Sequence, residues 1–289
     1  MVVDKAVIPI AGLGTRFLPV TLSIPKVMIP ILNYPALHYC LQEVIDSGIT
    51  NIILVISEPQ REVIDGYFNH HSSPASTLVG KGNKNLIEQV EKIREITQIE
   101  YIVQKQPLGL GHAVLLAKES ISNDSFAVLL PDDLILGNTP TTRTMLDIHS
   151  SGGEVIIAIK KVPSESIENL GIIDTPDSQG PVRKITGMVE KPKLSDAPSD
   201  LAIIGRYILP SEIFEAIENL QQGALGEIQL TDAIESMIPT KGCKGFLLEA
   251  NHFDVGTPMG MLKASIYKAL SDKATEKELR DWLGNLESI

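Results

Sequence analysis

Two glycines and two cations near the N-terminus of this chain are the residues best suited to binding phosphate. Gly12 and Gly14 follow a short apolar run, residues 6–10, that is typical of a buried strand. Without a Cβ, each glycine can present its backbone N–H to an anion at close range. Arg16 and Lys26 would add fixed positive charge for a polyphosphate. We therefore expect a nucleotide site here, the alternative being that a Gly-x-Gly after a strand is only a tight turn.

Two aspartates from distant parts of the chain could hold a divalent cation beside that turn. Asp132 follows the apolar run 126–130, and Asp254 follows another predicted strand. Mg²⁺ prefers oxygen ligands and keeps coordination positions for substrate phosphates. Two carboxylates that meet beside a phosphate-binding loop would provide such a site. The alternative is that Asp132 or its neighbour Asp133 only caps the following turn.

The spacing around the glycines is more specific than the glycines themselves. From Gly12 to Pro30 the chain reads G-x-G-T-R-x-x-P-x-T-x-x-x-P-K-x-x-x-P. This string resembles the signature of the sugar-1-phosphate nucleotidylyltransferase family, and the surrounding sequence is similar to the bacterial members that use UTP and glucose 1-phosphate. Leu-Pro-Asp-Asp and Phe-Asp-Val-Gly-Thr-Pro match the two metal-binding segments of that family. The resemblance therefore implies that Asp132 and Asp254 are Mg²⁺ ligands, with Asp133 a neighbour.

The resemblance also implies roles for residues whose types alone assign none. Charge neutralisation in catalysis falls to Arg16, Lys26 and Lys191. The nucleotide would contact the backbone at Ala11, Gly12, Gly14 and Gly109 and the amide of Gln104, which can donate and accept hydrogen bonds along the uracil edge. The sugar phosphate would lie against Gly171, Glu190 and Lys191, with Glu227 nearby. Taken alone, Glu190 and Lys191 could be a solvated surface pair, and Gln104 an exposed strand-end amide.

The activity that the resemblance implies is formation of UDP-glucose and pyrophosphate with Mg²⁺ as cofactor, in a homodimer or homotetramer. A thymidylyltransferase, or an enzyme for another sugar phosphate, is the nearest alternative. A catalytically silent paralogue that binds nucleotide sugar is a second alternative, motivated by two departures from the family pattern. Val27 stands where the family usually has glutamate, and Leu170 where it usually has tyrosine. Leu108 also stands where many members have lysine.

The elements that must position these residues alternate between strand and helix in the first half. Predicted strands 6–10, 51–57, 99–104, 126–130 and 154–159 are separated by predicted helices at 35–47, at 59–69 and from 111. This alternation predicts an α/β fold with a doubly wound, mostly parallel, Rossmann-like sheet and ligands at the carboxyl ends of its strands. Residues 72–85 are the most loop-like part of this half, and the sequence leaves open whether residues 72–98 form a lid.

The second half is richer in strands and polar loops. Strands are expected at 171–174, 185–190, 201–209 and 245–250, and helices at 210–221, 227–238, 259–271 and 275–286. We interpret the whole chain, 1–289, as one domain. Its nucleotide-binding half spans 1–160, its sugar-binding half, a smaller β-containing extension, spans 161–258, and C-terminal helices span 259–289.

Composition narrows the classes of partner. The chain has 289 residues, of which 43% are hydrophobic and 21% charged, and its formal net charge is −11. That charge argues against nucleic-acid binding, which needs a basic face. Cys40 and Cys243 are too few for a metal cage or a disulfide framework. The sequence shows no leader and no apolar run near the roughly 20 residues of a membrane span. We expect a cytoplasmic enzyme.

Overall fold

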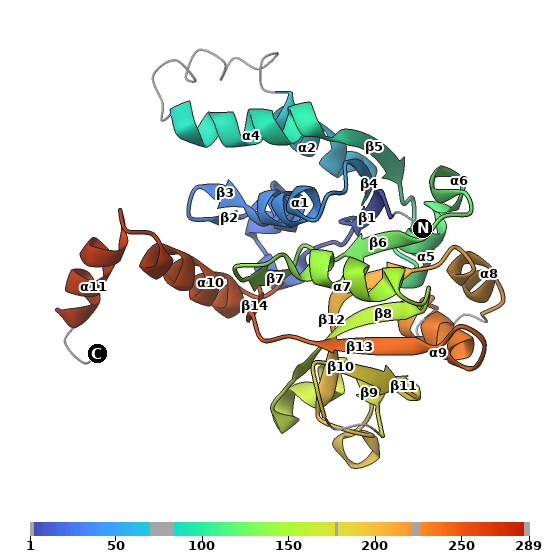
Figure 1. Cartoon of the computed structure of the whole chain (residues 1–289). Helices are drawn as coiled ribbons and strands as arrows, with labels where there is room; N and C mark the ends of the chain where they lie inside the picture. Colours follow the sequence, from blue (N-terminus) through green and yellow to red (C-terminus); the bar gives the residue numbers. More distant parts are fainter. Residues whose placement is uncertain (1–2, 70–83, 177–178, 221–225, 286–289) are drawn as a thin grey trace.

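The computed structural model describes residues 3–69, 84–176, 179–220 and 226–285 (Figure 1). One mixed sheet forms the centre of the molecule, and helices cover both of its faces. The α/β, mostly parallel architecture that the strand–helix alternation predicts is therefore confirmed. Along the main path of the sheet, the strands lie in the order β10 (Val182–Ile185), β13 (Cys243–Leu247), β8 (Val155–Lys161), β12 (Leu201–Leu209), β6 (Phe126–Leu129), β1 (Lys5–Pro9), β4 (Asn51–Ile56) and β5 (Gln98–Val103).

The strands that lead toward the predicted nucleotide site are parallel neighbours. β1 pairs in parallel with both β4 and β6, and β4 pairs in parallel with β5. Their carboxyl ends therefore meet at one edge of the sheet, where ligands bind in such folds. β12 lies antiparallel between β6 and β8. The strands β9 (Gly171–Asp174) and β11 (Gly187–Glu190) pair with each other, and β9 also pairs with β12.

The central sheet takes strands from both halves of the sequence. β12 and β13 come from the half predicted to bind sugar, yet both are strands of the main sheet. All nine residues of β12 are buried, because this strand is flanked by neighbours on both sides and covered on both faces. The predicted strand 185–190 is divided at Thr186 into β10 and β11.

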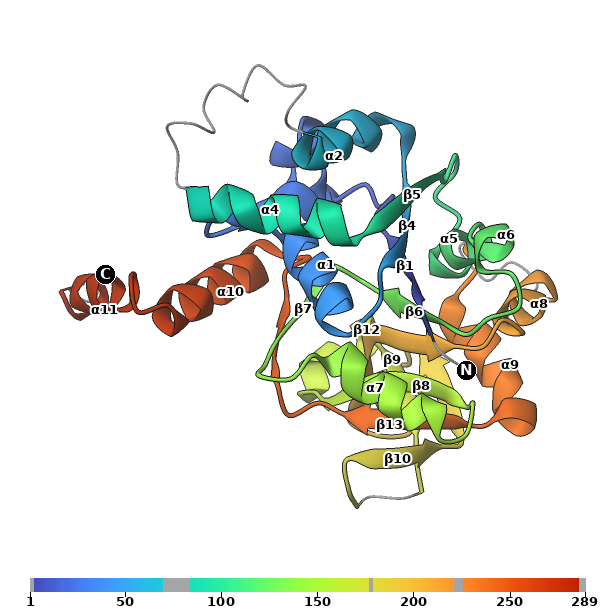
Figure 2. The same ribbon diagram turned by 45° about the horizontal axis from the view of Figure 1, so that its top comes forward.

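Each face of the sheet has its own hydrophobic core. Alternate side chains of a strand point to opposite faces, so Ala6 and Ile8 join one core and Val7 joins the other. The core that contains Ala6 and Ile8 is covered by α1 (Ala36–Asp46), α2 (Arg61–Phe68), α4 (Lys84–Ile96) and α7 (Thr141–Ser150). The core that contains Val7 is covered by α5 (Leu110–Leu115), α6 (Lys118–Ile121), α8 (Ile213–Glu218) and α9 (Leu230–Lys241). Figure 2 shows α7 crossing β8 and β12.

A small two-stranded sheet lies beside the main one and was not predicted. It pairs β7 (Asp133–Leu136) with β14 (Asn251–Asp254) in antiparallel fashion. Asp254 therefore ends β14, whereas the predicted strand 245–250 corresponds to β13, which ends at Leu247. The helix α7 was also not predicted. Of the predicted loop 72–85, residues 84 and 85 begin α4, and the rest lies outside the described residues.

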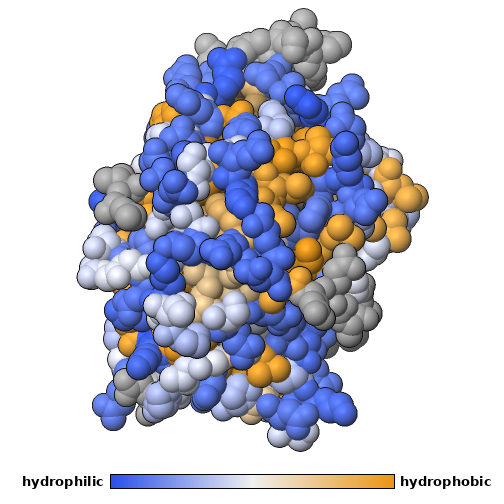
Figure 3. Space-filling view, turned by 90° about the vertical axis from the view of Figure 1, so that its right-hand side faces the viewer, coloured by the Kyte–Doolittle hydropathy of each residue, from blue (hydrophilic) through white to orange (hydrophobic). Residues whose placement is uncertain are grey.

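The last two helices, α10 (Pro258–Ser271) and α11 (Glu276–Gly284), extend away from the sheet (Figure 1). In the described part of the chain, no helix is both long and apolar enough to cross a membrane. On the face shown in Figure 3, hydrophilic side chains predominate and apolar ones form separate patches.

Candidate active site

The glycine turn lies directly after β1, as predicted. Ala11 is buried, and a Cβ built on Gly12 would meet nothing within 4 Å, so space is open beside this residue. The carbonyl of Gly12 accepts a hydrogen bond from the Gln60 amide at 3.3 Å. Gly14 has φ 64°, and its carbonyl accepts from the Thr21 hydroxyl at 2.9 Å. The turn is therefore fixed by side chains on one side and open on the other.

The turn and two predicted charged residues, Lys26 and Asp132, lie together. Lys26 begins a 3-10 turn, Lys26–Met28, and a Cβ on Gly14 would lie 3.0 Å from the Cβ of Lys26. The Lys26 Nζ donates to Asp132 Oδ2 at 2.7 Å. Asp132 comes directly after Pro131 at the end of β6, so a strand end brings the carboxylate to the cation. Arg16 is exposed and close enough to Asp254 to favour its charged form.

The two predicted metal ligands converge on one point. A Cβ built on Gly256 would lie 2.9 Å from Asp254 Oδ1 and 3.1 Å from Asp132 Oδ2. The Val255 N–H donates to the Asp132 carbonyl at 2.7 Å and joins the two segments. Burial raises the pKa of Asp254, and the nearby carboxylates of Asp133 and Asp132 raise it further. Crowded carboxylates of this kind suit a divalent cation, since two oxygen donors leave positions for phosphate. Within the described residues, no set of three or more His, Cys, Asp or Glu side chains is arranged to hold a metal.

A second group of predicted residues surrounds Glu190, the last residue of β11. Glu190 Oε2 accepts from the Thr231 hydroxyl at 2.8 Å, and a Cβ on Gly171 would lie 3.0 Å from the same oxygen. Lys191 has the positive φ of 47°, which is rare for a side-chain-bearing residue. Its N–H donates to the Leu170 carbonyl at 3.1 Å, and its Nζ lies 3.5 Å from Glu190 Oε1. The Lys191 side chain is 53% exposed and therefore free to meet an anion.

Gln104 and Gly109 form a third group. The Gln104 side chain is buried, and its Nε2 lies 3.3 Å from the Gly109 carbonyl and 2.9 Å from His112 Nδ1. Both N–H groups of the amide are thereby used inside the turn, which leaves Oε1 as the group that can meet a ligand. Burial lowers the pKa of His112, which favours the neutral ring that can accept this bond.

The third group is joined to the second through Ile228. The Ile228 N–H donates to the Leu108 carbonyl and its carbonyl accepts from the Gly111 N–H, both at 2.8 Å. A Cβ on Gly109 would lie 2.7 Å from the Ile228 carbonyl oxygen, so only glycine permits this approach. Glu227, directly before Ile228, accepts from the Gln229 amide at 3.0 Å. The segment therefore connects the Gln104 turn to the start of α9, where Thr231 holds Glu190.

Carboxylates from the metal side and from the sugar side both influence one buried side chain, that of Tyr207. Burial raises the pKa of Tyr207 on β12, and the charges of Asp133, Glu190 and Asp132 raise it further. Asp132 and Glu190, far apart in the sequence, thus lie within electrostatic range of the same hydroxyl. Asp132 from the metal side and Glu190 from the sugar side therefore both lie near the central strand β12.

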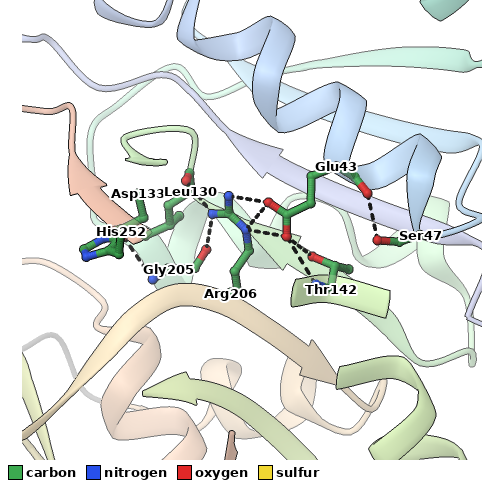
Figure 4. A network of polar contacts seen from close by, with 8 residues as sticks. All are labelled: Glu43, Ser47, Leu130, Asp133, Thr142, Gly205, Arg206 and His252. Atoms are coloured by element: carbon green, nitrogen blue, oxygen red, sulfur yellow. Dashed lines mark hydrogen bonds and ion pairs between the residues drawn. The ribbon is translucent and has the colours of Figure 1, made fainter. Parts of the chain in front are cut away.

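A buried ion pair that the sequence analysis missed supports this region (Figure 4). Arg206, 1% exposed, donates from Nη2 to Glu43 Oε2 at 2.8 Å and from Nη1 to the Leu130 carbonyl at 2.8 Å. Glu43 also accepts from the N–H and hydroxyl of Thr142. Burial would raise the pKa of Glu43, but the Arg206 charge and these hydrogen bonds lower it. An arginine inside an otherwise apolar strand such as 201–209 was the available signal, because it requires a buried partner.

Asp133, which the sequence analysis left as a neighbour of the metal ligand, forms a second, partly buried link. Its Oδ1 lies 2.6 Å from His252 Nε2, and its Oδ2 accepts from the Gly205 N–H at 3.0 Å (Figure 4). Burial would raise the pKa of Asp133, but the hydrogen bond and charge of His252, with Arg206, lower it. The residue after the predicted ligand Asp132 is thus fixed to two other segments.

The departures from the family pattern are accommodated by packing. Val27 is buried and belongs to the core beneath α1. Leu170 is half-buried and packs against the cluster that contains Ile167, Ile172 and Ala202. Leu108 contributes its carbonyl to the hydrogen bond with Ile228.

The fold and site define a nucleotidyltransferase, and the chain belongs to the nucleotidyl transferase family, whose sequence profile matches residues 5–269. It is 40% identical over 285 residues to a UTP–glucose-1-phosphate uridylyltransferase of Staphylococcus epidermidis, covering 99% of each chain. It is 41% identical over 281 residues to a protein of the same name from Bacillus subtilis, covering 97% of this chain and 94% of the relative. A solved structure of a UTP-bound UGPase from Acinetobacter baumannii superposes with a TM-score of 0.89 at 36% identity, covering 99% of this chain and 100% of the other. The family resemblance predicted from the sequence is confirmed.

Proposed function

We propose that this protein transfers the uridylyl group of UTP to glucose 1-phosphate, forming UDP-glucose and releasing pyrophosphate. Full-length similarity to two uridylyltransferases supports the reaction. The observation that carries it in the structure is the convergence of Asp132, Asp254 and Lys26 on the glycine turn, with Lys191 on the sugar side.

The chain's own residues supply charge and orientation. An oxygen of glucose 1-phosphate attacks the α-phosphorus of UTP, and the bond to the leaving pyrophosphate breaks as the new O–P bond forms. The attacking phosphate is already an anion, so positioning and charge neutralisation are the main requirements. Arg16 and Lys26 would neutralise the triphosphate, and Lys191 would align the sugar phosphate. Asp132 and Asp254 fit Mg²⁺, which when bound neutralises phosphate charge.

The base and sugar contacts follow from the same geometry. Gln104 presents Oε1, an acceptor that suits the N3–H of uracil. Thymine carries the same N3–H, so this contact supports a pyrimidine but does not separate UTP from dTTP. Glu190, held by Thr231, would accept hydrogen bonds from sugar hydroxyls.

Release of pyrophosphate from pairs of substrates tests the reaction directly. We expect UTP with glucose 1-phosphate to give the highest kcat/KM among UTP, dTTP, ATP and GTP combined with several sugar 1-phosphates. A preference for dTTP would make the protein a thymidylyltransferase. Binding of UDP-glucose with no turnover of any pair would support the silent paralogue instead.

Two substitutions test the residue roles. Lys191→Ala and Asp132→Asn should each raise the barrier by about 2.7–4 kcal/mol, or 10²–10³ in rate, by analogy with the loss of one transition-state hydrogen-bond donor. Lys193→Ala is the control for the first, since Lys193 is exposed and close in sequence. Asp124→Asn is the control for the second, since Asp124 pairs with Lys5 at 3.8 Å away from the site. Rates for the site variants that match those of their controls would refute the assignment.

A further inference from the structure

An aspartate–histidine pair joins β14, which ends at the proposed metal ligand Asp254, to β7, which begins directly after the proposed ligand Asp132. In the sheet formed by β7 and β14, Asp133 lies opposite Asp254 and His252 lies opposite Ile135. His252 Nε2 and Asp133 Oδ1 are 2.6 Å apart across this sheet. Asp133 directly follows Asp132, and His252 is two positions before Asp254. The pair therefore links the two segments next to the ligands themselves.

The same carboxylate is also anchored to the central sheet. Asp133 Oδ2 accepts from the backbone N–H of Gly205 on β12 at 3.0 Å (Figure 4). A Cβ on Gly205 would lie 2.5 Å from this oxygen, so the carboxylate is pressed against the backbone. The Asp133 and His252 side chains are 22% and 12% exposed. Even a partly buried carboxylate is costly unless its oxygens have partners, and here both have one.

The proposed ligands need such support because they repel one another. Asp132 Oδ2 and Asp254 Oδ1 both lie about 3 Å from one point, the Cβ position of Gly256. Two carboxylates this close disfavour each other's charge, and Lys26 offsets this only on the Asp132 side. Against this repulsion, the Val255 N–H bond to the Asp132 carbonyl and the Asp133–His252 bond hold the segments together on either side.

We propose that Asp133 and His252 are positioning residues that hold Asp132 and Asp254 at metal-binding separation before the ion binds. This inference rests on the proposed function, which assigns the ion to those two aspartates. Partners that orient metal ligands typically change metal affinity by roughly 10–100-fold when they are removed. Asp133 and His252 are assigned a positioning role because the contacts described for them, between each other and with Gly205, lie within the protein.

The test compares His252→Phe with His252→Gln, which keeps a side-chain N–H donor. Mn²⁺ alone is the probe, titrated into the protein and followed by electron paramagnetic resonance. We expect His252→Phe to weaken Mn²⁺ binding about 10–100-fold and to raise the Mg²⁺ concentration needed for half-maximal activity by a similar factor. His252→Gln should recover part of the loss. The affinity for UTP measured in EDTA should stay within about twofold, because the glycine turn is untouched.

His149→Phe is the matched control. His149 is buried, and its ring hydrogen-bonds to the Glu154 carbonyl at 2.7 Å, at the far end of α7. This variant should lower the unfolding midpoint without changing Mn²⁺ affinity. If His252→Phe lowers the midpoint equally and leaves Mn²⁺ affinity unchanged, the pair only stabilises the fold and the inference is wrong.

Asp132→Asn separates that outcome from failure of the proposed function. Should Asp132→Asn bind Mn²⁺ as the parent protein does, the proposed metal site itself is wrong. Should it lose Mn²⁺ binding while His252→Phe keeps it, only the positioning role is wrong. Asp133→Asn, which keeps one oxygen acceptor, should fall between the parent and His252→Phe in Mn²⁺ affinity.

Discussion

The buried Arg206–Glu43 pair allows a quantitative test of what holds the strand ends in place. Glu43 on α1 accepts from Arg206 Nε at 3.1 and 3.2 Å and from Nη2 at 2.8 Å. Their side chains are only 9% and 2% exposed, so water cannot replace a lost partner. The guanidinium also binds the Leu130 carbonyl, at the start of the segment that carries Asp132. We therefore expect the pair to couple strongly in a double-mutant cycle.

The expected losses of stability depend on which buried groups each substitution leaves without a partner. Glu43→Leu leaves the Arg206 charge buried without its counterion, at a cost of about 3–5 kcal/mol. Arg206→Met leaves Glu43 charged or forces its protonation, at a similar cost. The double variant leaves no charge buried without a partner. Its remaining cost, about 1–3 kcal/mol, comes from the carbonyls of Leu130 and Gly205 and the Thr142 groups, which lose their partners. The single losses together come to about 6–10 kcal/mol, against about 1–3 kcal/mol for the double variant. The double variant should therefore be more stable than either single variant, with an interaction energy of at least about 3 kcal/mol.

Urea unfolding of the four proteins, followed by circular dichroism, measures this cycle. The losses should appear as shifted midpoints, and Glu43→Gln, which keeps one carbonyl oxygen, should lose less than Glu43→Leu. A double variant less stable than both single variants would show that the charges do not compensate each other. A Glu43→Leu cost below about 1 kcal/mol, the range of exposed pairs, would show that the pair is solvated in solution.

Two further predictions concern pH and the sugar side. Burial lowers the pKa of His38 in the folded protein to about 4, whereas in the unfolded chain it stays near the ordinary value of 6.5. Between these two values the unfolded chain binds a proton that the folded protein does not. The free energy of unfolding should therefore fall as the pH drops from about 6.5 to 4, by up to about 3 kcal/mol. Chemical unfolding at several pH values should show this dependence of stability on pH, and His38→Phe should reduce it. An unchanged dependence in that variant would show that another group takes up the proton. Thr231→Val removes the hydroxyl bound to Glu190 and should cost about 0.5–1.5 kcal/mol in glucose 1-phosphate binding. Steady-state kinetics should show an unchanged KM for UTP. Equal changes in KM for UTP and for glucose 1-phosphate would contradict a role for Thr231 on the sugar side alone.

Local sequence determined much of the architecture. Apolar runs such as 51–57 form buried strands whose ends lie within a residue or two of the predicted ends. This agreement is expected because the periodicity of strands and helices depends on near neighbours in the sequence. The position of the glycine turn was also predicted locally, from Gly-x-Gly after an apolar run, although Gln60 and Thr21 fix the turn in the fold. The spaced motif identified the family and nominated Asp132 and Asp254 before any coordinates. The strand 245–250 was displaced and β14 was missed, because a four-residue strand of mixed polarity carries almost no periodic signal.

Only the tertiary structure decided what holds those aspartates together. The pairing of β7 with β14 joins residues more than a hundred positions apart, and no local pattern determines such a register. Arg206 was visible in the sequence as a charge within a buried strand, but its choice of Glu43 depended on how α1 packs over β12. The Asp133–His252 bond arises in the same way. A buried charge takes whichever partner the packing brings within hydrogen-bond distance, and that distance is a property of the whole fold.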